Sequence, residues 1–262
     1  QDLVNVPEIS TELACLARAW NHDLAISPEK HREARDCLVA VVNANATLVP
    51  ALTMLGALHL GDFRHNSDHP TDDPLGRADR LLRRAIHVAP SSSAPYQVLQ
   101  NLMLLRGDGE AAVAAGLRSL QNNPEDMIAL AGDGAVLARI GRYEEAVSLL
   151  TRAAAETAVE PQWMQFHTFL ALNNLGRTRE ADERAAFFDR STAALPLAAA
   201  AIRAHRRGDE AGAARAIAAV AKIEPEFRHD PKGFLRRRGF TEPVADRLLV
   251  DLVAAGLGRT PP

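Results

Sequence analysis

The sequence predicts an all-α array of about six helical hairpins with capping helices at its C-terminus. Four glycines that end apolar-periodic stretches lie 34, 35 and 32 residues apart, and such spacing is typical of stacked helical repeats. These glycines are Gly107, Gly141, Gly176 and Gly208. Aromatic residues make up 5% of the 262 residues against 47% apolar residues, which favours closely packed helices over strands. Pro90 and Pro124 lie one period apart, each where a second helix should stop.

Residues 1–46 are predicted to form a degenerate first hairpin, with helices over 8–22 and 28–44. Ser27 suits an N-cap, and Pro28 suits the first helical position. Cys15 and Cys37 are the only cysteines, and they lie equally far from the predicted turn at Ile26. They should therefore face each other across the hairpin. A disulfide, two buried free thiols, and a reactive or metal-binding pair all stay open.

Residues 37–61 contain no charge and are long enough to span a bilayer. Asn43, Asn45, Thr47 and Pro50 interrupt the middle of this run with residues typical of turns and helix starts. Two buried helices joined by a turn are therefore expected here.

Residues 47–225 carry the repeat, and RIGRYEEAVSLLTRAA around Gly141 displays it most plainly. This pattern resembles the tetratricopeptide repeat over about residues 48–225. Leu55 and Gly56 match the signature of its first helix. The small position of its second helix is matched by Ala78, Ala112, Ala146, Ala181 and Ala213. Asp133 and Gln100 depart from the signature, and the fifth unit matches poorly. The resemblance implies a tetratricopeptide-like right-handed superhelix.

An insertion at 61–76, GDFRHNSDHPTDDPLG, separates the helices of the second hairpin. Its acids and imidazoles suggest a divalent metal site or pH sensing, with His65, Asp68 and His69 as weak metal candidates. The spacing fits no known metal motif, so a solvated loop is the competing interpretation. No cofactor is expected.

Residues 226–262 are predicted to cap the array, with helices near 232–237 and 243–255. With SPEKHREARDCL and GFTEPVADRLLVDLVAAGL, the chain resembles the C-terminal repeat region of bacterial membrane-anchored regulators of the adenylate cyclase or winged-helix type. That resemblance implies a sensory or docking domain, with a membrane helix and an output domain before Gln1.

In the register of the tetratricopeptide repeat, the concave groove is lined by amides, arginines and two aromatic rings. These residues are Gln97, Asn101, Arg139, Trp163, Phe166, Asn173, Asn174 and Arg206. Such side chains suit a peptide backbone or a small polar ligand. Interhelix packing is the alternative for Trp163 and Phe166.

A net charge of -3 gives no strong field toward nucleic acid or an anionic membrane, and Arg236 to Arg238 is interpreted as a solvated face. We therefore expect a non-catalytic sensory or protein-interaction domain of a bacterial signalling or transcriptional regulator, binding a protein, peptide or small signal. A periplasmic location and a homodimer are further expectations. The alternatives are a cytoplasmic scaffold for protein complexes and a metal-dependent site in the 61–76 loop.

Overall fold

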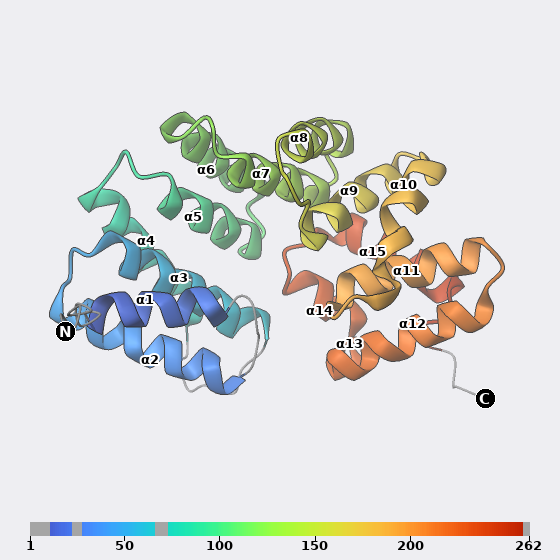
Figure 1. Cartoon of the computed structure of the whole chain (residues 1–262), viewed down its shortest axis with the longest axis horizontal. Coiled ribbons are helices and arrows are strands. Elements are labelled where there is room, and N and C mark those ends of the chain that lie inside the picture. The colour runs from blue at the N-terminus through green and yellow to red at the C-terminus, as the bar shows by residue number, and fades with distance from the viewer. Residues whose placement is uncertain (1–10, 23–27, 66–72, 259–262) are drawn as a thin grey trace, which may run out of the picture. The chain divides into compact units, whose positions relative to one another are not determined.

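The structure, a computed structural model, describes residues 11–22, 28–65 and 73–258. These residues form α-helices and one 3-10 helix, and no strand occurs among them. The first helices are α1 (Thr11–His22), α2 (Pro28–Ala44), α3 (Val49–Arg64), α4 (Pro74–Val88) and α5 (Ala94–Leu105). They are followed by α6 (Gly109–Asn122), α7 (Met127–Ile140), α8 (Tyr143–Ala155), α9 (Gln162–Asn174) and α10 (Thr178–Arg184). The chain continues with η1 (Ala185–Arg190), α11 (Ala194–Arg206), α12 (Glu210–Ile223), α13 (Pro225–His229), α14 (Pro231–Arg236) and α15 (Glu242–Ala254) (Figure 1).

The chain divides into two compact units, Gln1–Leu102 and Met103–Pro262. The boundary falls near the end of α5, inside the segment assigned to repeats. Within the units, consecutive helices pack as hairpins: α1 with α2, α3 with α4, α7 with α8, α9 with α10, and α11 with α12. The predicted division at 46 and 225 follows the repeat register and stays an interpretation of the sequence.

The four periodic glycines end helices in the left-handed conformation that other residues rarely adopt. Their φ angles are 81°, 93°, 74° and 75° for Gly107, Gly141, Gly176 and Gly208. At Gly141 the N–H of the next residue, Arg142, donates to the carbonyl of Leu137 at 2.9 Å, which closes the end of α7. The sequence period thus marks the ends of α5, α7, α9 and α11.

The small positions of the repeat lie where the second helix of each pair meets its neighbours. All five alanines have an exposed fraction of 0%. Close approach extends to α7, because a Cβ built on Gly134 would lie 2.7 Å from Cγ of Leu150 on α8. This packing confirms the predicted all-α, tetratricopeptide-like fold class.

The α9–α10 pair, which is the fifth unit of the repeat, is irregular, as its poor match to the tetratricopeptide pattern predicts. Its second helix, α10, has only 7 residues and passes directly into η1. Phe188 of η1 is fully buried and takes part in the core of the second unit.

The inserted loop is shorter than predicted. Residues 61–64 belong to α3, and α4 begins at Pro74. Asp62 is buried in the last turns of α3, while Asp73 caps α4 by accepting from the N–H of Gly76 at 2.8 Å. The predicted bounds of the loop, 61 and 76, were therefore wrong. Helix α3 continues past Gly61 because the Asp62 side chain has hydrogen-bond partners in the interior of the first unit. No helix in the described ranges combines the length and apolar character needed to cross a membrane.

The C-terminal helices form part of the core of the second unit. Both predicted helices are present, as α14 and α15, and Gly256 follows α15 with a φ of 105°. Val244, Leu248 and Leu252 of α15 are buried in the same cluster as Phe166 and Leu197. Helix α15 is therefore an integral part of the hydrophobic core of the second unit.

Candidate functional site

In the second unit, most of the predicted groove residues are engaged by the C-terminal helices. The backbone at Arg139 accepts from the Thr241 N–H at 3.1 Å and from its Oγ1 at 3.2 Å. The guanidinium of Arg139 donates to the carbonyl of Arg238 at 3.0 Å, and its side chain is buried at 9% exposure. Arg139 therefore fastens α7 to the turn that precedes α15.

Asn173 and Arg206 meet α15 farther along its length. Nδ2 of Asn173 donates to Asp251 of α15 at 2.7 Å. Arg206 bonds to Oδ1 of Asn173, and its Nη1 donates to Asp182 at 3.0 Å. Asp251 also lies 3.9 Å from Arg206. These polar groups form one network between α9, α10, α11 and α15.

The aromatic pair divides between core and surface. Phe166 is 1% exposed and packs edge-on against Phe240 at a centroid distance of 6.4 Å. This residue therefore follows the alternative interpretation, in which it packs in the core. Trp163 keeps an exposed fraction of 38%. Asn174 donates to the carbonyl of Leu170 at 2.8 Å within its own helix. Of the predicted groove residues in the second unit, Trp163 is therefore the one that is exposed to solvent.

In the first unit, Gln97 and Asn101 are half-buried on α5. Nδ2 of Asn101 donates to the carbonyl of Gln97 at 3.1 Å, and its Oδ1 accepts from Arg64 of α3 at 3.4 Å. The two predicted residues therefore lie together, beside the end of α3. Their role in ligand binding stays a prediction.

Of the three residues predicted as metal ligands, His65 alone lies among the described residues. Asp68 and His69 lie outside the described residues, and His65 is exposed just after α3. Within the described ranges, no group of three or more histidine, cysteine or acidic side chains could hold a metal ion.

The Arg236 to Arg238 run is only partly a solvated face. Arg237 pairs with Glu226, and Arg238 donates to Glu224 at 2.8 Å. The guanidinium of Arg238 also stacks 3.5 Å above the ring of Phe234. Arg237 and Arg238, which directly follow α14, thus bond to the segment at the start of α13.

The first unit carries a groove between α2, α3 and α4 that we call the arginine groove. Its volume is about 340 Å³. Its floor and walls include Val39, Val42, Asn43, Leu55, His59, Arg77, Arg80, Leu81 and Arg84. The three arginines follow one face of α4, at a spacing of three and four residues. Among the described residues, no acidic side chain lines it.

A buried polar network lies behind the groove at His59. The Asp62 carboxylate accepts from Nε2 of His31 at 2.6 Å and from Nδ1 of His59 at 3.0 Å. Burial alone would raise the pKa of Asp62, but these two hydrogen bonds and the nearby imidazoles hold its pKa well below its usual value. Arg35 lies 3.6 Å from the same carboxylate. The negative charge of Asp62 is therefore balanced by these buried partners.

The arginine groove was not predicted from the sequence. In the sequence, an exposed helix face is the ordinary interpretation of Arg77, Arg80 and Arg84. The groove beside them forms only when α2 packs on α3. The charge pattern along α4 was the only available signal.

A second groove, in the second unit, has mixed charge. It encloses about 430 Å³ between η1, α11 and α12, with Leu197, Ala204, Ala216 and Ala219 among its apolar lining. Three arginines share it with Asp189 and Asp209. Asp189 lies 3.9 Å from Arg203, and Asp209 caps α12 through the N–H of Gly212 at 2.7 Å.

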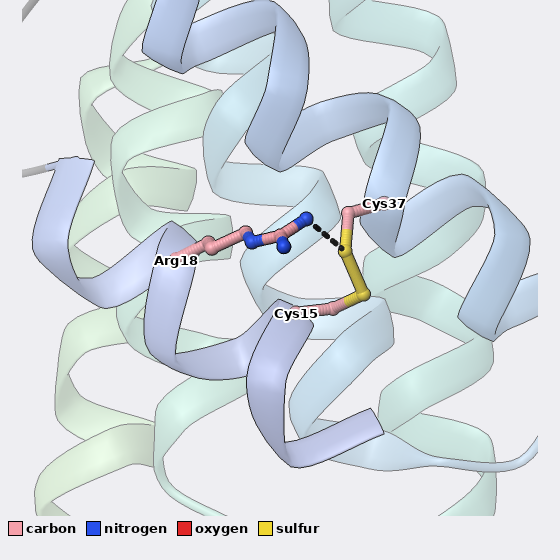
Figure 2. The surroundings of a disulfide bond; sticks show 3 residues. All are labelled: Cys15, Arg18 and Cys37. Atoms are coloured by element: carbon pink, nitrogen blue, oxygen red, sulfur yellow. Dashed lines mark hydrogen bonds between the residues drawn. A yellow bond between two sulfur atoms is a disulfide. The ribbon is translucent and has the colours of Figure 1, made fainter. Parts of the chain in front are cut away.

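A disulfide joins α1 to α2, as Figure 2 shows. The Cα atoms of Cys15 and Cys37 lie 5.5 Å apart, and Arg18 donates to Sγ of Cys37 at 3.6 Å. The structure thus contains the bond that the symmetric placement of the two cysteines suggests, although the Ile26 turn lies outside the described residues.

This arrangement defines the protein as a tandem array of helical hairpins with surface grooves. No family model matches the chain, and no curated protein matches it. Among solved structures, PilW, a widely conserved type IV pilus biogenesis factor, shares 16% identity, with a TM-score of 0.59 over 82% of this chain and 94% of that one. Pseudomonas aeruginosa PilF shares 13% identity, with a TM-score of 0.58 over 84% and 97%. A tetratricopeptide repeat protein from Parabacteroides merdae shares 14% identity, with a TM-score of 0.50 over 93% and 99%. At these identities the likeness establishes the fold.

Proposed function

We propose that this chain is a non-catalytic protein-interaction module, a tetratricopeptide scaffold that holds protein or peptide partners. The observation that carries the proposal is that each compact unit bears a groove with apolar lining and three arginines. Apolar grooves flanked by arginines are a recurring way to bind short segments of a partner protein. The scaffold is favoured over a sensor of small signals, because Arg139, Asn173 and Arg206 already bond to the C-terminal helices.

The disulfide supports a periplasmic or other oxidising location, since such bonds are rare in reducing compartments. A regulator with a membrane helix and an output domain is one setting for the scaffold, supported by the resemblance of the end segments. A small-molecule signal and a homodimer stay predictions of the sequence.

Site-specific photo-crosslinking in the native host tests this function. A photoreactive residue replaces Val39 in the arginine groove, Ala216 in the second groove, or Leu117 on α6 as an exposed control outside both. We expect a protein partner to be captured from at least one groove position and to bind the purified chain in calorimetry. If neither position yields a protein that binds after purification, the scaffold proposal is wrong.

A further inference from the structure

We propose that the arginine groove binds an acidic segment of a partner protein, with an apolar side chain of that segment resting on the groove floor. This inference rests on the proposed function and names the chemistry of one partner. It is carried by the unpaired arginines, the apolar floor and the size of the groove.

The arginines supply positive charge that the described residues leave uncompensated. Within the described part of the chain, no ion pair involves Arg77, Arg80 or Arg84. Their neighbour Arg83 behaves differently, because its Nε donates to Asp79 at 2.8 Å on the same helix. Three exposed guanidinium groups along one edge can bind carboxylates through paired N–H donors.

The floor explains why a free anion would not use the whole groove. Leu55 and Val42 are buried, Leu81 is half-buried, and Val39 is 38% exposed at the rim. An apolar side chain placed there loses contact with water and is stabilised by that burial. The occupant should therefore carry carboxylates and an apolar residue close together.

The lining argues against single-stranded nucleic acid as the occupant. Such ligands stack their bases on aromatic rings, and within the described part of the chain the His59 imidazole is the one aromatic ring that lines this groove. The volume of about 340 Å³ leaves room for a few side chains of a short peptide segment. Anionic lipid is the remaining rival and is included in the test.

The test measures fluorescence anisotropy of the full chain with a short labelled peptide of glutamate and leucine. Its counterpart carries glutamine in place of glutamate. The groove variant R80Q/R84Q is compared with R83Q/R152Q, which removes the same charge from exposed positions outside the groove. All four side chains are exposed, so circular dichroism should show both variants folded.

We expect the glutamate peptide to bind and the glutamine peptide to bind at least about tenfold more weakly, since the carboxylates supply the ion pairs. R80Q/R84Q should lose about tenfold in affinity, and R83Q/R152Q less than about twofold. V39N should also weaken binding, because it removes part of the apolar rim.

Equal affinity of the two double variants, equal binding of the two peptides, or no peptide binding would overturn the inference. Binding of phosphatidylglycerol vesicles that R80Q/R84Q abolishes, without peptide binding, would assign the groove to a membrane surface instead. A partner that crosslinks only at Ala216 would contradict this inference and leave the scaffold function standing. Peptide binding without any crosslinked partner would contradict the scaffold function alone.

Discussion

At the scale of single residues, Arg139 has the clearest change of role. Its guanidinium and its carbonyl both bond to the segment between α14 and α15, and its side chain is buried. We predict that Arg139→Ala lowers the free energy of unfolding by about 2 kcal/mol, because charged hydrogen bonds are lost and a buried carbonyl is left with fewer donors. Urea unfolding measures this.

The matched control is Arg152→Ala on α8, where the side chain is exposed. Its effect should stay within about 0.5 kcal/mol. Equal stability of Arg139→Ala and the parent protein would restore Arg139 as a candidate ligand contact.

His167 gives the second unit a sensitivity to acid. Burial, with the nearby Arg139 charge, lowers the pKa of His167 to about 3, and its Nδ1 donates to the carbonyl of Trp163 at 2.7 Å. The unfolded chain has a histidine pKa of about 6.5, so between these two values the unfolded state binds more protons. The stability that neutral His167 contributes is therefore fully present above the pKa of the unfolded state. It is lost as pH falls toward the pKa of the folded state.

We predict that the parent protein loses up to about 1.4 kcal/mol per pH unit through His167 below pH about 6.5. His167→Met removes this proton uptake, so its urea midpoint should fall less between neutral and mildly acidic pH. The same fall in both proteins would show that His167 is protonated in the folded state.

The roles of Arg139, Asn173 and Arg206 could not be predicted from the sequence. Their first-helix positions are read correctly from the repeat register. Their partners, however, lie 99 residues away for Arg139 and 78 residues away for Asn173, so only the tertiary fold brings them together. The alanine positions could be predicted, because close helix contact requires a small residue wherever it recurs.

At the scale of elements, the α1–α2 hairpin depends on its disulfide. The bond closes a sequence separation of 22 residues, and a bond of this span stabilises by about 3 kcal/mol. We predict no free thiol under denaturing, non-reducing conditions and two after reduction. Reduced parent protein should match Cys15→Ser/Cys37→Ser in stability. Two thiols titrating in oxidised material would remove the main support for an oxidising location.

Helix α15 is predicted to be essential to the core of the second unit. Leu248 is fully buried, whereas Val250 two positions on is 69% exposed. Leu248→Ala should cost about 2–5 kcal/mol through lost burial and a residual cavity, and Val250→Ala less than about 0.5 kcal/mol. Calorimetric melting compares the two. Equal melting temperatures would mean that α15 is only loosely packed.

Element ends were predicted where local chemistry decides them. Pro28 opens α2 and Gly141 ends α7, as their backbone preferences require. The end of α3 was misplaced because Asp62 looked like a loop acid. Its contacts with His31 of α2, which is 31 residues away, keep it inside the helix.

At the scale of the whole molecule, the repeat period was sufficient to predict the fold class. It could not predict the two compact units or the grooves, because these depend on which helices lie beside one another after packing. The arginine groove needs α2, α3 and α4 together, and no short stretch of sequence contains all three.

Hydrogen–deuterium exchange of the full chain, with and without the purified crosslinked partner, tests most directly whether a partner binds in the arginine groove. We predict added protection over Val39–Asn43 of α2 and over Arg77–Arg84 of α4, because these segments line the arginine groove. Protection confined to α9 and α11, with no change in these two segments, would contradict binding in the arginine groove.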